Sequence, residues 1–276
     1  MRGVLNLAGM KHNLLFHVHL AASIAFVATI SIVRAAEPEP EWRELPLISD
    51  GKVSPEWVHV GRGKFVVDNG ALRTEPDTKG LGLAVYKKER FGDCQIRIVY
   101  KAKEEKSNSG VYVRIADRIL DQANNPGAAF DRDAAGKPSE ESMEAVKASA
   151  DQGEGAWYAV HHGYEVQIMD SGDRMHRTGA IYSLAPAEAV EKPAGDWRTL
   201  TITLKGEQIL VDLDGKRVTT FDPTSPNLPE RKEGHEPKRE PKRPEAGYIG
   251  LQTHDPGDVV WFKEVSIRPL PADADR

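Results

Sequence analysis

The sequence predicts an all-β fold, a sandwich of two antiparallel sheets, on the basis of three observations. Short runs of β-branched and aromatic residues recur along the chain, several of them alternate polar and apolar residues, and turn-forming residues separate them. This pattern is typical of half-buried strands in a sandwich. The runs cover residues 94–100, 110–115, 163–169, 198–204, 247–253 and 259–267.

Two hairpins are predicted from their turns. Asn69-Gly70 separates the runs KFVV and ALRT, and Asp214-Gly215 separates QILVDL from KRVTTF. Both dipeptides favour the two-residue turns in which backbone torsion angles are positive. We therefore expect adjacent antiparallel strands on either side of each turn.

The N-terminal segment resembles an export signal. Residues 20–33 form an uncharged apolar run of 14 residues, shorter than the roughly 20 needed to span a bilayer. Lys11 precedes the run, and Val33 and Ala35 provide small or apolar residues before a cleavage site. We expect residues 1–35 to be a signal peptide, with Met10 as an alternative start, and the mature chain to be periplasmic or extracellular without a stable membrane span. An uncleaved anchor is the alternative.

Charge and cysteine content exclude several classes of protein. The 276 residues carry 37 basic and 42 acidic side chains, a net charge of −5. Cleavage after Ala35 would remove three basic residues and no acidic one, and the net charge would become −8. An acidic exported chain does not suit a nucleic-acid partner. The single cysteine, Cys94, excludes a disulfide within the chain, and we expect it to be a buried thiol.

Two segments interrupt the strand pattern. Residues 116–157 form a long insertion in which Met143, Val146 and Ala150 have helical spacing, so we expect a short helix there. Residues 225–246 carry five prolines and eleven charged residues, which excludes a core strand and predicts an exposed loop. Either insertion could border a binding site.

Strand periodicity places several polar side chains on one face of a sheet. Residues i and i+2 of a strand share a face, and the run 158–169 is taken here as one strand. Side chains that can both donate and accept hydrogen bonds then gather together, as sugar hydroxyls require. A bulge in any strand would reverse this assignment. The residues of this face are Tyr112 and Arg114, His161, Glu165 and Gln167, and Gln252 and His254.

Five ordered motifs resemble one family. Together they are similar to the 3-keto-disaccharide hydrolase domain family, long catalogued as domain of unknown function 1080. The resemblance covers residues 42–270 as a single domain, with 116–157 and 225–246 longer than the family pattern. It implies a concanavalin A-like jelly-roll sandwich with a concave carbohydrate-binding face. The motifs are NSGVYVR at 108–114, GYEVQIMD at 163–170, TGAIY at 178–182, DWRT at 196–199 and GYIGLQTH at 247–254.

The resemblance also implies a substrate, an oligosaccharide or glycoside oxidised at C3. Such a ketone acidifies the hydrogen on C2, so a base can start an elimination that expels the C1 substituent. We expect Glu165 or His254 to be the base, the other to assist the leaving group, and Arg114 to stabilise the enolate oxygen. The expected substrate-binding residues are Asn108, Tyr112, His161, Gln167, Tyr182 and Gln252.

Other functions remain open at this stage. The polar face could be an ordinary solvent-exposed face, or a lectin-like module could bind glycans through Trp157, Tyr182 or Trp197. A protein-interaction domain using residues 225–246 is a third possibility. No cofactor is firmly implied, although a divalent cation held by His161, Glu165 and His254 could polarise the ketone.

Overall fold

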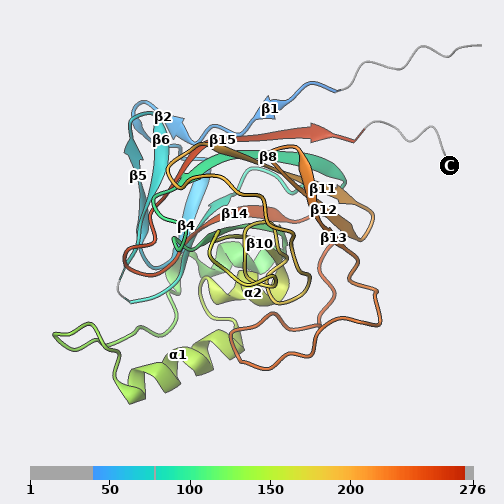
Figure 1. Cartoon of the computed structure of the whole chain (residues 1–276). Helices are drawn as coiled ribbons and strands as arrows, with labels where there is room; N and C mark the ends of the chain where they lie inside the picture. Colours follow the sequence, from blue (N-terminus) through green and yellow to red (C-terminus); the bar gives the residue numbers. More distant parts are fainter. Residues whose placement is uncertain (1–39, 78, 271–276) are drawn as a thin grey trace, which may run out of the picture. The chain divides into compact units, whose positions relative to one another are not determined.

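The protein is a sandwich of two antiparallel sheets, described by a computed structural model for residues 40–77 and 79–270 (Figure 1). The predicted signal peptide lies outside the described residues. The larger sheet has eight strands: β1 (Arg43–Glu44), β5 (Lys64–Asp68), β6 (Ala71–Glu75), β8 (Cys94–Ala102), β11 (Arg198–Lys205), β12 (Gln208–Leu213), β13 (Lys216–Phe221) and β15 (Val260–Pro269). The smaller has five: β4 (Trp57–Gly61), β7 (Gly82–Tyr86), β9 (Ser109–Ile115), β10 (Tyr164–Ile168) and β14 (Tyr248–Thr253). This confirms the predicted fold class.

The order of strands brings distant segments of the chain together. In the larger sheet it is β13-β12-β11-β8-β15-β6-β5, with β1 beside β15, and in the smaller sheet it is β10-β9-β14-β7-β4. Strands β2 (Ile48–Ser49) and β3 (Lys52–Val53) form a separate two-stranded ladder. Three neighbouring strands of the smaller sheet, β10, β9 and β14, are the ones whose sequences carry most of the predicted site residues.

Both predicted hairpins are present. Strands β5 and β6 pair as far as Asp68 and Ala71, and the intervening Asn69 and Gly70 have φ angles of 50° and 77°. Asp214 and Gly215, between β12 and β13, have φ angles of 50° and 82°. Two consecutive positive φ angles are the geometry that matches the twist of paired strands.

The main core lies between the sheets and follows the alternation in the sequence. Along β8, buried and half-buried residues alternate, so that Ile96, Ile98 and Tyr100 face the core. Val111 and Val113 of β9 meet the same core from the smaller sheet. Cys94 belongs to this core as a free, buried thiol, as expected. Within the described residues, no helix is long and apolar enough to cross a membrane.

The first insertion covers part of the outer face of the smaller sheet. Helices η1 (Asp117–Asn124) and α2 (Trp157–His162) enclose a second apolar cluster with β4, β7 and β9. Ile119, Tyr158 and Val160 belong to it, together with Leu83 and Ile115 of the sheet. Part of the face that was predicted to be polar is therefore an apolar contact surface.

Residues 157–162 form a helix, so the prediction of one strand over 158–169 is wrong for its first half. Tyr158 and Val160 have the spacing of one strand face, but residues 158–161 are all buried. The backbone turns because the N–H groups of Trp157, Tyr158 and Ala159 each donate to a carbonyl three residues earlier. Gly163 is extended, with φ −144°, and β10 begins after it. The hydrophobic pattern alone does not distinguish these two structures in so short a segment.

The predicted helix in the insertion is α1 (Glu140–Gln152). The side chain of Ser139 accepts a hydrogen bond from the backbone N–H of Ser142 at 3.2 Å, and Gly153 ends the helix in the left-handed conformation. Val146 and Ala150 are buried. Both ends of α1 are thus defined by local capping interactions.

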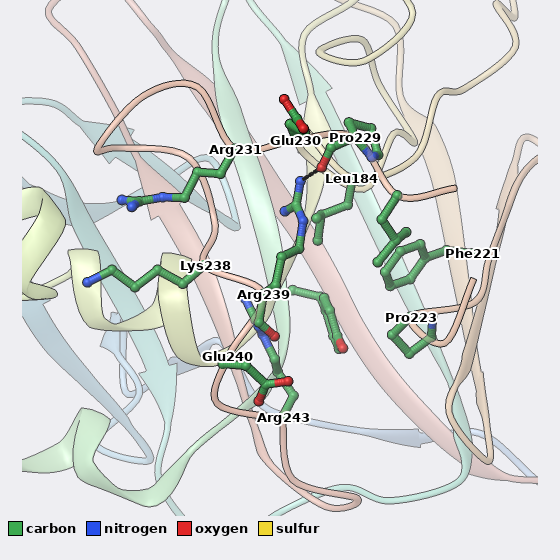
Figure 2. A pocket seen from close by; sticks show the side chains of 12 residues that line it. Leu184, Phe221, Pro223, Pro229, Glu230, Arg231, Lys238, Arg239, Glu240 and Arg243 are labelled. Atoms are coloured by element: carbon green, nitrogen blue, oxygen red, sulfur yellow. Dashed lines mark hydrogen bonds between the residues drawn. The ribbon is translucent and has the colours of Figure 1, made fainter. Parts of the chain in front are cut away.

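The second insertion, 225–246, contains no strand, and it packs against the end of α1. Arg231 donates to the carboxylate of Asp151 at 2.7 Å, and the Nζ of Lys238 lies 3.8 Å from the same carboxylate. Figure 2 shows Arg231, Lys238, Arg239 and other side chains of this loop around a cavity of about 500 Å³. Ion pairs with α1 therefore hold this loop, which we expected to be simply exposed.

The alternation along β8 gives a stability prediction. We expect Ile98→Ala to lower the free energy of unfolding by about 2–5 kcal/mol, because it leaves a cavity between the sheets. The neighbouring half-buried Val99 faces away from the core, so Val99→Ala is the matched control and should cost less than ~1 kcal/mol. Urea unfolding of the two variants measures this difference, and equal losses would contradict the assigned core face.

Candidate active site

A polar cavity of about 320 Å³ opens on the outer face of the smaller sheet, beside the apolar cluster under α2. We call it the polar cavity. Its volume lies at the lower end of the range of about 300–1,000 Å³ common for small-ligand sites. It is lined by Leu81, Asn108, Tyr112, Trp157, Val160, Glu165, Gln167, Met169, His176, Tyr182, His235, Gln252 and His254.

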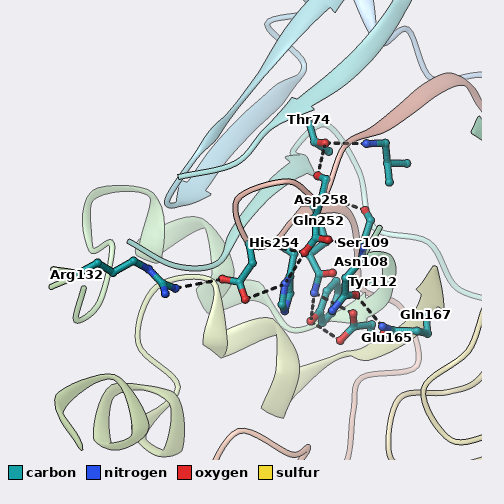
Figure 3. Close-up of polar contacts among 12 residues, drawn as sticks. Thr74, Asn108, Ser109, Tyr112, Arg132, Glu165, Gln167, Gln252, His254 and Asp258 are labelled. Carbon is teal, nitrogen blue, oxygen red and sulfur yellow. Dashed lines mark hydrogen bonds and ion pairs between the residues drawn. The ribbon is translucent and has the colours of Figure 1, made fainter. Parts of the chain in front are cut away.

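Three side chains from three adjacent strands form the floor of this cavity (Figure 3). The hydroxyl of Tyr112 donates to Oε2 of Glu165 at 2.6 Å. Nε2 of Gln252 lies 2.8 Å from Oε1 of Glu165 and 3.1 Å from the Tyr112 hydroxyl oxygen. The arrangement follows from register, because Glu165 and Gly250 both pair with Tyr112 across the sheet.

Glycine 110 makes room for this carboxylate. A Cβ atom at Gly110 would lie 2.5 Å from Oε1 of Glu165 and 2.9 Å from its Cγ, closer than such atoms can approach. Gly110, in the motif at 108–114, is therefore a steric requirement of the site.

Burial makes Glu165 a weak acid. Its exposed fraction is 8%, and desolvation raises its pKa from the ordinary value of 4.5 to about 7, although the hydrogen bonds from Tyr112 and Gln252 and the nearby His254 act in the opposite direction. Burial and Glu165 in turn raise the pKa of Tyr112 well above its ordinary value, so Tyr112 stays a hydrogen-bond donor. A carboxyl group that ionises near neutral pH is suited to proton transfer.

His254 is the second ionisable group of the cavity wall. Its Nδ1 lies 3.1 Å from Oδ2 of Asp258, and its side chain is 30% exposed. Desolvation opposes the charged form, but the hydrogen bond to Asp258 and the charges of Asp255, Asp258 and Glu165 outweigh it and raise the pKa of His254. Since Nδ1 is occupied by Asp258, Nε2 is the nitrogen left for a ligand.

Asp258 is itself fixed from several sides. Its Oδ1 accepts the backbone N–H of Asn108 at 3.0 Å, and its carbonyl oxygen accepts the hydroxyl of Thr74 in β6 of the larger sheet at 3.1 Å. The same Thr74 hydroxyl accepts the backbone N–H of Val260 at 2.9 Å. Figure 3 shows this chain of contacts leading from the larger sheet to His254.

The remaining wall carries uncharged hydrogen-bonding groups. Nε2 of Gln167 donates to Oδ1 of Asn108 at 2.8 Å. Tyr182 is held beside Glu165 by its backbone N–H, which donates to the Glu165 carbonyl at 3.0 Å, and its ring centre is 5.3 Å from that of His176. Asn108, Gln167 and Tyr182, three of the predicted substrate-binding residues, thus line the cavity, and their binding role stays a prediction.

Arg114 lies elsewhere, so its predicted place on this face is wrong. Its φ angle is +53°, and β9 has one residue more than β14 between the pairs Ile115–Tyr248 and Tyr112–Gly250. This bulge turns Arg114 away from the cavity, where its guanidinium donates to the Gly206 carbonyl and approaches Asp93 at 3.5 Å. Ile115 takes the position on the outer face.

His161 is also separated from the site, because it belongs to α2. It is 1% exposed, its Nε2 contacts the Ala150 carbonyl at 2.6 Å, and burial lowers its pKa to about 4. The cation site suggested by His161, Glu165 and His254 is therefore not assembled. Within residues 40–77 and 79–270, no three His, Cys, Asp or Glu side chains are placed to share a metal ion.

Sequence analysis did not identify His176 and His235 as site residues. His176 sits in the turn between two motifs, with Nδ1 on Asp173 and Nε2 on Ser183, and this nearness to the motifs was a usable signal. His235 comes from the 225–246 insertion, where nothing in the local sequence points to a cavity. Of the aromatic residues proposed for a lectin-like groove, Trp157 and Tyr182 line the cavity. Trp197 does not, and its ring instead makes cation–π contacts with the ammonium groups of Lys101 and Lys263.

The fold and this cavity define a β-sandwich with a polar cavity on the outer face of its smaller sheet. Residues 41–268 match the 3-keto-alpha-glucoside-1,2-lyase-like domain. The chain belongs to this family, which confirms the resemblance found in the sequence. No curated protein matches the chain.

Solved structures similar to this chain include two from Parabacteroides distasonis ATCC 8503, each described as a "putative glycosyl hydrolase". One is 15% identical, with a TM-score of 0.51, and the match covers 80% of this chain and 92% of that one. The other is 22% identical, with a TM-score of 0.48 and coverage of 83% and 100%. The carbohydrate binding module CBM66 from Bacillus subtilis is 12% identical, with a TM-score of 0.43 and coverage of 80% and 98%. The structure with a TM-score of 0.51 supports the assignment of the fold.

The raised pKa of Glu165 predicts how stability depends on pH. The folded state favours the uncharged acid, so its contribution to stability is complete below the ordinary pKa of 4.5 and is lost as pH rises to about 7. Glu165→Gln removes this loss. We expect the unfolding free energy of the variant, relative to the unmodified protein, to increase by up to ~3 kcal/mol between pH 4.5 and pH 8.

Chemical denaturation at several pH values measures this effect. The matched control is Glu141→Gln, because Glu141 is exposed on α1 and its replacement should leave the pH dependence unchanged. A constant difference between Glu165→Gln and the unmodified protein over this range would show that Glu165 is an ordinary carboxyl group.

Proposed function

We propose that the protein cleaves the C1–O bond of 3-keto-glycosides by elimination across C1 and C2, followed by addition of water. The observation that carries the proposal is a single buried carboxyl group with a pKa near 7 on the floor of the polar cavity. Membership of the 3-keto-alpha-glucoside-1,2-lyase-like family supports the choice of substrate and reaction. The expected signal peptide would place this activity outside the cytoplasm.

The alternative route to glycoside cleavage requires a different site. Hydrolysis through an oxocarbenium-like transition state uses two carboxyl groups, roughly 5–9.5 Å apart, on either side of the bond. Among the described residues lining the polar cavity, Glu165 is the one acidic side chain. One base with a separate proton donor suits elimination, because a C3 ketone already makes the C2 hydrogen acidic.

The proposed reaction has three steps: removal of the C2 proton, loss of the C1 substituent, and addition of water. Glu165 takes the proton from C2, and the electrons of that bond form an enolate with the C3 carbonyl. The enolate then expels the C1 oxygen, to which His254 gives a proton, leaving a C1–C2 double bond conjugated with the ketone. Water then adds across this double bond: its oxygen bonds to C1, one of its protons goes to His254, and Glu165 gives its proton back to C2, which yields the free 3-keto sugar and restores both residues to their starting states.

The roles agree with the ionisation of the two groups. Near neutral pH a large fraction of Glu165 is deprotonated, and the raised pKa of His254 favours the protonated form that donates. Tyr112 and Gln252 hold the carboxylate in place through neutral donors. With Arg114 outside the cavity, the enolate would be stabilised by neutral groups, of which the Tyr182 hydroxyl and the Gln167 amide are the candidates.

A pair of substrates tests the proposed class of reaction. The protein is incubated with a 3-keto-disaccharide and with the same disaccharide unoxidised, and release of the reducing sugar is followed. We expect cleavage of the keto form alone, with a primary isotope effect when C2 carries deuterium. Cleavage of both forms at similar rates, or no cleavage of the keto form, would refute the proposal.

Glu165→Gln should abolish most of this activity. We expect kcat to fall by about 10²–10⁴-fold, because the amide cannot accept the C2 proton. The matched control Glu141→Gln should retain full activity. For the unmodified protein, kcat/KM should rise with pH through about 7 as Glu165 ionises, and then fall when His254 loses its proton.

Asp258→Asn tests the assignment of His254 as the acid. Asp258 does not line the cavity but raises the pKa of His254, so it acts as a positioning residue. Its replacement should move the alkaline limb of the kcat/KM profile to lower pH while leaving the acidic limb in place. If the alkaline limb does not move, His254 is not the group that titrates there.

A further inference from the structure

A second cavity, of about 280 Å³, adjoins the polar cavity, and we call it the apolar cavity. The two share four lining residues, Leu81, Trp157, His235 and His254. They are therefore neighbouring parts of one site. The further residues of the apolar cavity are Gly80, Phe130, Met143, Val146, Lys147, Ala150 and Asp255.

The first insertion builds the wall of the apolar cavity. Met143, Val146 and Ala150 lie three and four residues apart on one face of α1, which faces this space. Ser139 and Gly153 fix the two ends of the helix. Phe130, from the segment before α1, adds an aromatic side chain. Phe130, Met143, Val146, Lys147, Ala150 and Trp157 thus bring most of the cavity lining from residues 116–157.

The chemistry of this wall does not suit a second sugar. Leu81, Phe130, Met143, Val146 and Ala150 offer no side-chain donor or strong acceptor, and the polar groups of the lining belong to Lys147, Asp255 and the shared residues Trp157, His235 and His254. Sugar hydroxyl groups placed against the five apolar side chains would be buried without partners, which is unfavourable. A hydrocarbon ring would instead exchange water for apolar contacts.

His254 lies at the boundary between the two cavities, where the C1–O bond of the substrate would be cleaved. His254 lines both, and its Nδ1 is held by Asp258, so that Nε2 is available at the boundary. Glu165 lines only the polar cavity. A keto sugar with C2 at Glu165 and its C1 oxygen at His254 therefore directs its leaving group into the apolar cavity.

We propose that the apolar cavity binds the leaving group, and that the preferred substrates are 3-keto-glycosides of hydrophobic alcohols with aromatic or alicyclic rings. This inference rests on the proposed function of the polar cavity. The bond changes are the same: the C2 proton goes to Glu165, the C1–O bond breaks, and the hydrophobic alcohol leaves with a proton from His254.

Two substrates with leaving groups of similar basicity test the preference. One is the 3-keto-glucoside of cyclohexylmethanol, and the other is a 3-keto-disaccharide with a primary alcohol as its leaving group. We expect kcat/KM to be at least about tenfold higher for the cyclohexylmethyl compound, mainly through a lower KM. Equal values, or a preference for the disaccharide, would overturn the inference.

Variants of α1 connect the preference to this cavity. Met143→Gln places an amide in the apolar wall and should lower kcat/KM for the cyclohexylmethyl substrate by about tenfold, with little change for the disaccharide. Ala148→Gln is the matched control, because Ala148 is exposed on the same helix and does not line the cavity. An equal effect of both variants, or none for Met143→Gln, would count against the assignment.

A binding measurement separates this inference from the proposed function. Calorimetry with 2-naphthol, a hydrophobic alcohol that cannot react, should detect binding to the unmodified protein and to Glu165→Gln, and at least about tenfold weaker binding to Met143→Gln. If no 3-keto-glycoside is cleaved but this pattern is found, the proposed reaction fails and the apolar site stands. If cleavage occurs and 2-naphthol does not bind, the apolar site fails alone.

Discussion

The site depends on one hydrogen-bonded unit, the Glu165 carboxyl group held by Tyr112 and Gln252. These side chains come from β10, β9 and β14, and the sheet register alone brings them into contact. Both partners are neutral donors, so they orient the carboxylate without supplying the positive charge that would keep its pKa low. The steric demand for glycine at position 110 follows from the same arrangement.

The first insertion completes this environment. A bare outer face of a sandwich sheet is open to water, and a carboxyl group on it would keep its ordinary acidity. Here η1 and α2 cover a neighbouring part of the face with apolar side chains, and Trp157 and Val160 of α2 also line the polar cavity. The insertion thus shapes the same cavity in which burial raises the pKa of Glu165.

Much of the site could be predicted because strands are regular. Alternation placed Tyr112, Glu165, Gln167 and Gln252 on one face, and antiparallel pairing brought them together because the bulge between β9 and β14 lies beyond Tyr112, on the side of Arg114. The assignment of Arg114 failed because one extra residue in β9 shifted it to the other face, and a bulge of this kind leaves no trace in residue type. The fold class itself was predictable from the strand and turn pattern.

The assignment of His161 failed for a different reason. The spacing of Tyr158 and Val160 fits either a strand or a short helix packed on a surface, and tertiary contacts decide between them. The side chains of α2 pack on Leu83 and Ile115 of the smaller sheet, and this contact is absent from the local sequence. His235 could not be predicted as a site residue either, because tertiary contacts position it. Ion pairs of Arg231 and Lys238 with Asp151 of α1 hold its loop near the cavity.

The hydrogen bond between Thr74 and Asp258 has a consequence for the cost of binding. Thr74 belongs to the larger sheet, and Asp258 holds His254 beside the smaller one. The turn that carries His254 is therefore fastened to both layers of the sandwich before any ligand arrives. Little conformational entropy remains for this residue to lose when a substrate binds, so more of the binding energy is available for the reaction itself.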